Sequence, residues 1–224
     1  MRLRLRVPES GLARTALTLT VVAGLVDAAA FMVLGGVFVA NQTGNCVLLA
    51  IGIAERIPIG DAGADRPHAG VTGPLMSLAA FCAGAAAAGW GGLRVPRRVA
   101  AFLPLLGAEA LLLAAAAALP GPDWARVGLV AAAMGVQSVQ AVRLEVPGVT
   151  TTVVTGTLAS LFDKLTDERP RRRGTGLLTL VWVLYIAGAV AGALGARLWS
   201  FTAVCWCAVA LTVLRAALSE PPGR

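Results

Sequence analysis

Long apolar runs separated by short polar stretches make up most of the 224-residue chain. Six of these runs reach roughly 20 residues with few charges, the length that an α-helix needs to cross a hydrocarbon core about 30 Å thick. The other two runs are short and polar at one end. The eight segments lie at about 16–38, 40–55, 71–92, 99–119, 126–144, 149–162, 175–196 and 198–217. This pattern predicts an all-α polytopic membrane protein with about six transmembrane helices plus two short interrupted or re-entrant segments.

The two short segments each contain a Thr-Gly pair in apolar surroundings. The first is Ala40-Asn41-Gln42-Thr43-Gly44-Asn45, and the second is Thr150-Thr151-Thr152-Val153-Val154-Thr155-Gly156-Thr157. Their amides and hydroxyls need partners that lipid cannot supply, and a half-helix that begins inside the membrane presents a partial positive charge to a ligand. One hypothesis is that both segments frame a site for a small polar or anionic solute. The alternative is that they only hold helices together through small-residue packing and hydrogen bonds.

The predicted solute-binding residues come from these segments and from polar positions on neighbouring helices. They are Asp27, Asn41, Thr43, Gly44, Asn45, Gln137, Thr152, Thr155, Gly156 and Thr157. Asp27 lies within the first apolar run, where a carboxylate costs about 2.5–3.5 kcal/mol on insertion scales. Its expected role is either to carry a proton or coupling cation, or to hydrogen-bond the broken helix at 40–55. Glu109 raises similar alternatives, namely transport or a structural ion pair with a residue such as Arg143.

Composition and charge agree with a membrane protein. With 57% hydrophobic residues, 14% charged residues and a mean hydropathy of +0.77, the chain is too apolar for a soluble domain of this size. The net charge of +7 does not indicate nucleic-acid binding, because the basic clusters flank apolar runs and have no aromatic residues between them. They indicate contacts with anionic headgroups and a positive-inside topology. Both termini and the basic clusters at 94–98 and 164–173 face the cytoplasm only if the Thr-Gly segments re-enter, which favours six spans.

Three crossings in each half would place the second half upside down relative to the first. Residues 24–44 line up with 135–156, and residues 81–89 resemble 185–193. Inverted repeats with interrupted helices at matching positions are the architecture of many secondary transporters. The expected division is a cytoplasmic basic N-terminus at 1–15, a first membrane repeat at 16–119, a second membrane repeat at 120–217 and a C-terminal tail at 218–224.

No other motif predicts chemistry. The four cysteines have no metal or redox spacing and are expected to be inert packing residues. No nucleophile–base arrangement, metal-ligand cluster or phosphate-binding loop is visible in the sequence. We therefore expect no enzyme activity, no catalytic residues, no cofactor and no metal. An intramembrane enzyme would require Asp27 and Glu109 to converge on one cavity.

Several blocks together resemble a known family. They include Gly24-Leu25-Val26-Asp27-Ala28, Phe38-Val39-Ala40-Asn41-Gln42-Thr43-Gly44-Asn45, Val146-Pro147-Gly148 and Thr155-Gly156-Thr157. The combination is similar to the YoaK-type family of uncharacterised bacterial multipass membrane proteins, labelled as a domain of unknown function. The resemblance covers nearly the whole chain. It implies a plasma-membrane protein of about six spans and supplies no substrate and no catalytic residues.

We therefore expect an integral protein of the bacterial plasma (inner) membrane, with cytoplasmic termini, that acts as a secondary transporter or channel-like permease. The alternative is a non-transporting membrane scaffold or assembly protein. A scaffold would have tightly packed Thr-Gly segments without a polar opening, whereas a transporter needs a route to at least one side. The expected partners are the lipid bilayer and a small polar or anionic solute. The small-residue faces also allow a homo-oligomer.

Overall fold

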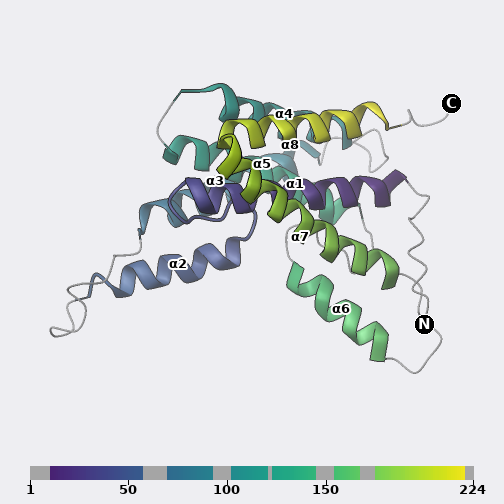
Figure 1. The fold of residues 1–224 in the computed structure, drawn as a ribbon, viewed down its shortest axis with the longest axis horizontal. Helices are drawn as coiled ribbons and strands as arrows, with labels where there is room; N and C mark the ends of the chain where they lie inside the picture. Colours follow the sequence, from purple (N-terminus) through teal and green to yellow (C-terminus); the bar gives the residue numbers. More distant parts are fainter. Residues whose placement is uncertain are drawn as a thin grey trace.

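The computed structural model describes residues 11–57, 70–92, 102–120, 123–144, 154–166 and 175–219, and these residues form eight α-helices and no strand (Figure 1). The helices are α1 (Gly11–Val33), α2 (Gln42–Ala54), α3 (Thr72–Gly92), α4 (Phe102–Ala118), α5 (Asp123–Arg143), α6 (Val154–Thr166), α7 (Thr175–Leu198) and α8 (Phe201–Ala217). The all-α class predicted from the apolar runs is confirmed for the described part of the chain.

Four of the described helices, α1, α3, α5 and α7, are long and apolar enough to cross a membrane by length and composition. Helices α4 and α8 have 17 residues each, which corresponds to about 25 Å at 1.5 Å per residue. They are apolar but shorter than the four candidates. An α-helical membrane protein is therefore supported, and the count of six spans, which needs α4 and α8 to cross as well, stays a prediction.

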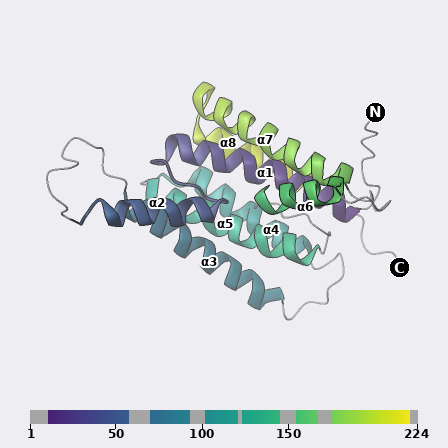
Figure 2. The same cartoon turned by 90° about the horizontal axis from the view of Figure 1, so that it is seen from below.

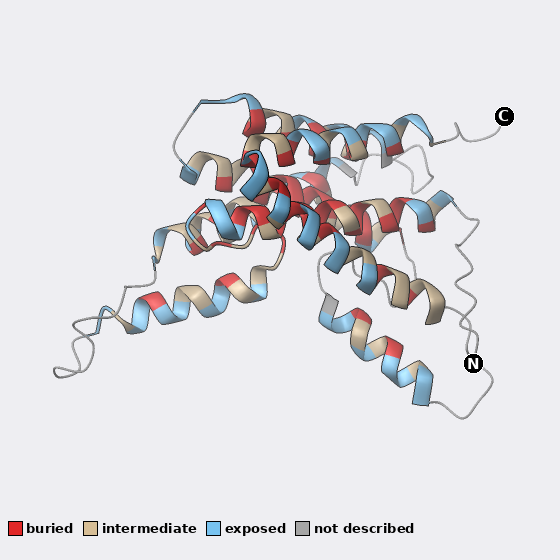
Figure 3. Ribbon diagram, viewed as in Figure 1, coloured by how far each residue is buried: buried red, intermediate tan, exposed pale blue. Residues whose placement is uncertain are grey.

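Helices α1 and α5 lie at the centre of the fold. In their most apolar windows, 67% of α1 and 50% of α5 are buried, against 22% of α3 and of α7. Helix α1 packs mainly against α7, and α5 packs mainly against α3. Burial is concentrated where these helices meet, and the outward ends of α2 and α6 are largely exposed (Figure 3). The exposed residues on the outer helices include many large apolar side chains, as lipid contact requires.

Close helix contacts in the two halves occur at matching glycines. A Cβ added at Gly24 would overlap the Tyr185 carbonyl, and one added at Gly135 would overlap the Phe81 carbonyl. The same correspondence links Gly188, which faces Val21, to Gly84, which faces Ala132. Residues 24 and 21 precede 135 and 132 by 111 positions, and residues 81 and 84 precede 185 and 188 by 104 positions. Small residues let membrane helices approach this closely, so the α1–α7 and α3–α5 contacts are built in the same way.

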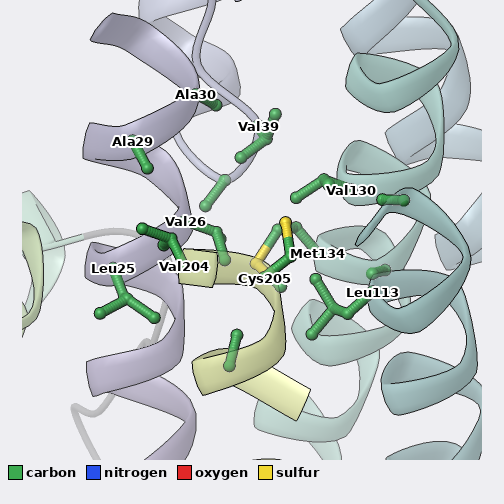
Figure 4. Close-up of a cluster of buried hydrophobic side chains, with 14 of the residues drawn as sticks. Leu25, Val26, Ala29, Ala30, Val39, Leu113, Val130, Met134, Val204 and Cys205 are labelled. Carbon is green, nitrogen blue, oxygen red and sulfur yellow. The ribbon is translucent and has the colours of Figure 1, made fainter. Parts of the chain in front are cut away.

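Two apolar clusters fill the interior. The first cluster joins α1, the chain after it, α4, α5 and α8; Figure 4 shows Val26 of α1 beside Val204 and Cys205 of α8, with Met134 and Leu113 on the facing helices. The second cluster consists of Ala16, Leu17, Leu19, Leu106, Leu144, Leu161, Leu178 and Val181. Both clusters contain residues of α1 and α4, so they lie at different levels along these helices.

The first helix ends earlier than predicted. The apolar run was expected to continue to residue 38, but α1 ends at Val33, and Gly35 and Gly36 adopt φ values of +81° and +72°. The Gly36 amide donates to the Phe31 carbonyl over 3.1 Å, the pattern of a Schellman motif with glycine in the left-handed conformation. Hydrophobicity could not reveal this stop because Leu34 and Val37 are buried like the helix before them.

Beyond this turn the chain runs back along α1 before α2 begins. Residues 39–41 lie beside Asp27, six residues before the end of α1, a return of about 9 Å at 1.5 Å per residue. Helix α2 then runs outward again, as a re-entrant half-helix would. In Figures 1 and 2, α2 and α6 both begin near the middle of the molecule and run outward to opposite sides.

Candidate functional site

The Asp27 carboxylate is the centre of the first Thr-Gly site. Its Oδ1 accepts hydrogen bonds from the amides of Val39 and Ala40, both at 2.8 Å, and a longer one from Asn41 at 3.4 Å. Its Oδ2 accepts from the Tyr185 hydroxyl at 2.9 Å. Asp27 is 3% exposed, so the carboxylate is removed from solvent. These contacts match the structural alternative, in which Asp27 hydrogen-bonds the broken helix.

Asn45 completes this turn from the first turn of α2. Its Oδ1 accepts from the Phe38 amide at 3.0 Å, and its Nδ2 donates to the Phe38 carbonyl at 2.6 Å. The same Nδ2 lies 3.0 Å from the Ser77 hydroxyl of α3, which itself donates to the Phe38 carbonyl at 2.7 Å. Gln42 donates to the Val39 carbonyl and to Ser77. One buried asparagine therefore satisfies both the amide and the carbonyl of Phe38, which have no helical partners in the break between α1 and α2.

The remaining residues of the first segment differ in exposure. Asn41 is the N-cap of α2, and its Oδ1 accepts from the Gly44 amide at 3.3 Å. A Cβ at Gly44 would lie 2.7 Å from the Phe38 ring, so glycine is the residue that fits there. Thr43 is exposed. The structure thus brings Asp27, Asn41, Gly44 and Asn45 together and leaves Thr43 at the surface of the cluster.

The described part of the second Thr-Gly segment, from Val154 onward, lies at the start of α6. Thr155 and Gly156 are exposed, whereas Thr157 is fully buried. Thr152 lies outside the described residues. Helix α6 packs against α7, and α2 packs against α3. The two segments are therefore held by different helices. Helices α2 and α6 do not pack extensively against each other.

Gln137 lies on α5 and belongs to a different contact. It is fully buried, and its Nε2 donates to the Leu19 carbonyl of α1 at 3.0 Å, while its Oε1 has no hydrogen-bond partner. It corresponds in sequence to the turn that holds Asp27, but no hydrogen bond joins it to the described residues of either Thr-Gly segment. The second half has no carboxylate at this turn.

The alternative in which Glu109 forms an ion pair with Arg143 is wrong. Both carboxylate oxygens of Glu109 are buried without a hydrogen-bond partner, and Arg143 Nη2 donates instead to the Gly89 carbonyl at 3.0 Å. Gly89 is among the last four residues of α3, whose carbonyls have no partner within the helix. Arg143 therefore caps α3. Asp27 and Glu109 share no hydrogen-bond partner. The Asp27 oxygens accept from residues 39–41 and Tyr185, whereas the Glu109 oxygens have no partner.

Sequence reasoning missed two members of the first site. Ser77 was not singled out, although it is the one hydroxyl in the apolar stretch 74–89, and an isolated polar side chain in a span normally has a partner. Tyr185 is the single tyrosine of the chain, and its hydroxyl needed an acceptor. Among the described residues, no three His, Cys, Asp or Glu side chains gather as they would to hold a metal ion.

The sequence is similar to known proteins over most of its length. Residues 15–218 match the family described as "Protein of unknown function (DUF1275)". The UPF0700 transmembrane protein YoaK of Bacillus subtilis (strain 168) is 32% identical over 193 residues, covering 79% of this chain and 80% of that protein. No solved structure matches the chain.

Proposed function

Because the chain belongs to the DUF1275 family, and because it is similar to a transmembrane protein, we propose that it is a permease, either a secondary transporter or a channel-like protein, for a small polar solute. The resemblance to YoaK-type proteins is confirmed by both comparisons. The family and the apolar helices support a membrane protein. The transport activity, the plasma-membrane location and the cytoplasmic termini are part of the proposal.

The proposed architecture is a pair of inverted repeats, α1–α4 and α5–α8. Three features support it. The α1–α7 contact has its counterpart in α5–α3, and the α2–α3 contact has its counterpart in α6–α7. The glycines that permit the α1–α7 and α3–α5 contacts occur at matching positions in the two halves. Two such halves, related by an axis in the membrane plane, place corresponding half-helices on either side of a central site in many transporters.

The observation that carries the proposal is the turn after α1, which brings residues 39–41 back beside Asp27 before α2 begins. A polar backbone segment at membrane depth is tolerated only where protein or a water-filled cavity covers it. Asp27 and Asn45 supply those partners, and α2 and α6 begin toward the middle of the molecule in both views (Figures 1 and 2). Among the described residues of the two segments, Thr43, Thr155 and Gly156 are exposed, and they would line the solute route.

The geometry favours a neutral polar solute over an anion at the first segment. A helix N-terminus attracts negative charge, but the Asp27 carboxylate already accepts the amides of Val39 and Ala40 there. An incoming anion would meet that carboxylate and be repelled. Hydroxyl and amide groups offer hydrogen bonds to an uncharged solute without this conflict.

Proteoliposome flux tests the proposal. Purified protein would be assayed with a panel of small neutral, anionic and cationic solutes, comparing wild type with Thr43→Val, Gly44→Leu and Asp27→Asn. Gly91→Leu is the matched control, because Gly91 is exposed and a Cβ there would meet nothing within 4 Å. We expect flux of at least one neutral polar solute that falls about tenfold or more in Gly44→Leu and persists in the control. Absence of flux for every solute, or unchanged flux in Gly44→Leu and Asp27→Asn, would contradict the proposal.

One observation favours a second candidate, a non-transporting membrane scaffold. The polar groups of Asp27, Asn45 and Ser77 are occupied by other groups of the protein, as expected for a packed structural turn. A scaffold would give no flux and would retain its fold in Thr43→Val. That the protein is not an enzyme stays a prediction.

A further inference from the structure

A layer of buried polar side chains separates the two apolar clusters. On α1, Thr20 lies between Leu19 of the second cluster and Val22 of the first. The same change of cluster occurs along α4 between Leu106 and Leu113, between Met134 of α5 and Leu144 directly after it, and along α8 between Ala208 and Ala216. The polar layer consists of Thr20, Glu109, Gln137, Gln140 and Thr212, and each of these residues is 0% exposed.

The four helices that supply the layer form a closed ring. Helix α1 contacts α8, α8 contacts α4, α4 contacts α5, and α5 contacts α1. Gln137 reaches across the ring to the Leu19 carbonyl. The Thr212 hydroxyl lies beside the Glu109 carboxyl, but it donates to the Ala208 carbonyl in its own helix at 3.0 Å. The polar side chains therefore come from neighbouring helices at one level.

Most of the hydrogen-bonding capacity of this layer is unused by the protein. Both oxygens of Glu109, both polar atoms of the Gln140 amide and Oε1 of Gln137 are buried without a partner. Buried polar groups in folded proteins are normally satisfied, and an unpaired buried carboxylate is especially costly. Such a group calls for an explanation by a bound ion, a water or a function.

No basic side chain of α5 or α8 donates a hydrogen bond to Glu109. Arg143 donates to the Gly89 carbonyl. Arg215 donates to the Thr15 hydroxyl at 2.8 Å and to the Gly11 carbonyl at 2.9 Å. Arg126, near the start of α5, lies beside Cys205 of the first cluster. Among the described residues, no basic side chain donates a hydrogen bond to Glu109, so a bound cation or a proton would have to neutralise it.

We propose that the polar layer binds one dehydrated monovalent cation of the sodium type, with Glu109 as the charged ligand and the Gln137 and Gln140 carboxamide oxygens as neutral ligands. Hard cations take oxygen ligands of this kind. A single carboxylate matches a single positive charge, whereas a divalent ion would leave an excess charge buried. A proton on Glu109 would supply only one donor and could satisfy only one of the remaining acceptors, while a cation contacts several oxygens together. Cation binding does not require that the protein transports a solute.

Thermal unfolding of the full-length protein in detergent tests this site. Wild type would be melted in sodium chloride, potassium chloride and choline chloride at equal ionic strength. A ligand that binds only the folded state raises the melting temperature with concentration, and we expect sodium or potassium to raise it by about 2–6 °C over choline. The response should disappear in Glu109→Gln, which keeps the shape of the side chain and removes its charge. It should persist in Asp163→Asn, which removes an exposed carboxylate of α6.

Gln140→Met provides a second readout if Glu109→Gln fails to fold. It removes an amide oxygen from the layer without changing charge, and we expect the alkali concentration at half-maximal response to rise about tenfold. Equal melting temperatures of wild type in alkali and choline salts would overturn the proposal; a layer filled by water, or a protonated Glu109, predicts that result. A full response retained in Glu109→Gln or in Gln140→Met would overturn it as well.

Discussion

Replacing Gly24 by alanine should destabilise the protein by forcing α1 and α7 apart. The added Cβ would overlap the Tyr185 carbonyl oxygen and lie 3.0 Å from the Ala189 amide nitrogen, whereas ordinary contacts begin at about 3.4 Å. Both neighbours are backbone atoms, which cannot rotate away as a side chain can. Relieving the nitrogen contact alone requires the helices to separate by about 0.4 Å (3.4 − 3.0), and the oxygen contact requires a larger separation.

The size of the effect follows from two opposing terms. Overpacking a well-packed interior typically costs about 1–3 kcal/mol, and α1–α7 is the most extensive helix contact in the described structure. Alanine favours a helix over glycine by up to about 1 kcal/mol, which offsets part of that cost. Because the overlap is with backbone atoms, the packing cost belongs at the upper end, about 2–3 kcal/mol. The net loss is then about 1–2 kcal/mol, equivalent to a fall in melting temperature of about 2–8 °C for a chain of this length.

Tryptophan fluorescence melts of the purified protein in detergent would measure this loss. Gly135→Ala should show a loss of similar size, because its Cβ would overlap the Phe81 carbonyl and lie 2.8 Å from the Ala85 nitrogen. Gly128→Ala is the matched control on α5, since a Cβ there meets nothing within 4 Å; its melting temperature should stay the same or rise. If Gly24→Ala melted together with Gly128→Ala, the close α1–α7 packing described above would be refuted.

Three further experiments test the polar contacts. Asp27→Leu should lower stability by about 2–6 kcal/mol, since two buried amides lose their acceptor at about 1–3 kcal/mol each, while Asp27→Asn should cost less; similar melting temperatures for the two variants would contradict the hydrogen bonds to residues 39–41. Asn45→Ala and Ser77→Ala should show a coupling energy of about 0.5–3 kcal/mol in a double-mutant cycle, and strictly additive losses would show that they do not share one network. Arg215→Lys should cost about 1–2 kcal/mol in thermal melts, because an ammonium cannot reproduce both guanidinium hydrogen bonds to α1; a stability equal to wild type would place Arg215 in solvent instead.

The sequence alone predicted the membrane class and the position of the unusual turn. Both depend on local properties: length of apolar runs, and polar side chains such as Asn41 and Asn45 where lipid offers no partner. The matching glycines at 24 and 135 were also visible as an internal correspondence. The two alternatives for Asp27 could be stated from its position, because a carboxylate in an apolar run must have a partner or a function.

Only the tertiary structure decided which partners these groups have. Tyr185 lies 158 residues beyond Asp27, and Ser77 lies 32 residues beyond Asn45; such pairs are set by which helices pack together, and a single sequence does not specify helix neighbours. The alternative of a Glu109–Arg143 pair was wrong for this reason, since opposite charges in sequence say nothing about distance across a bundle. The polar layer likewise emerged only when α1, α4, α5 and α8 were seen to form a ring. Hydrophobicity is a property of each segment and can be read along the chain, whereas a buried hydrogen bond is a property of two segments and exists only after they have packed.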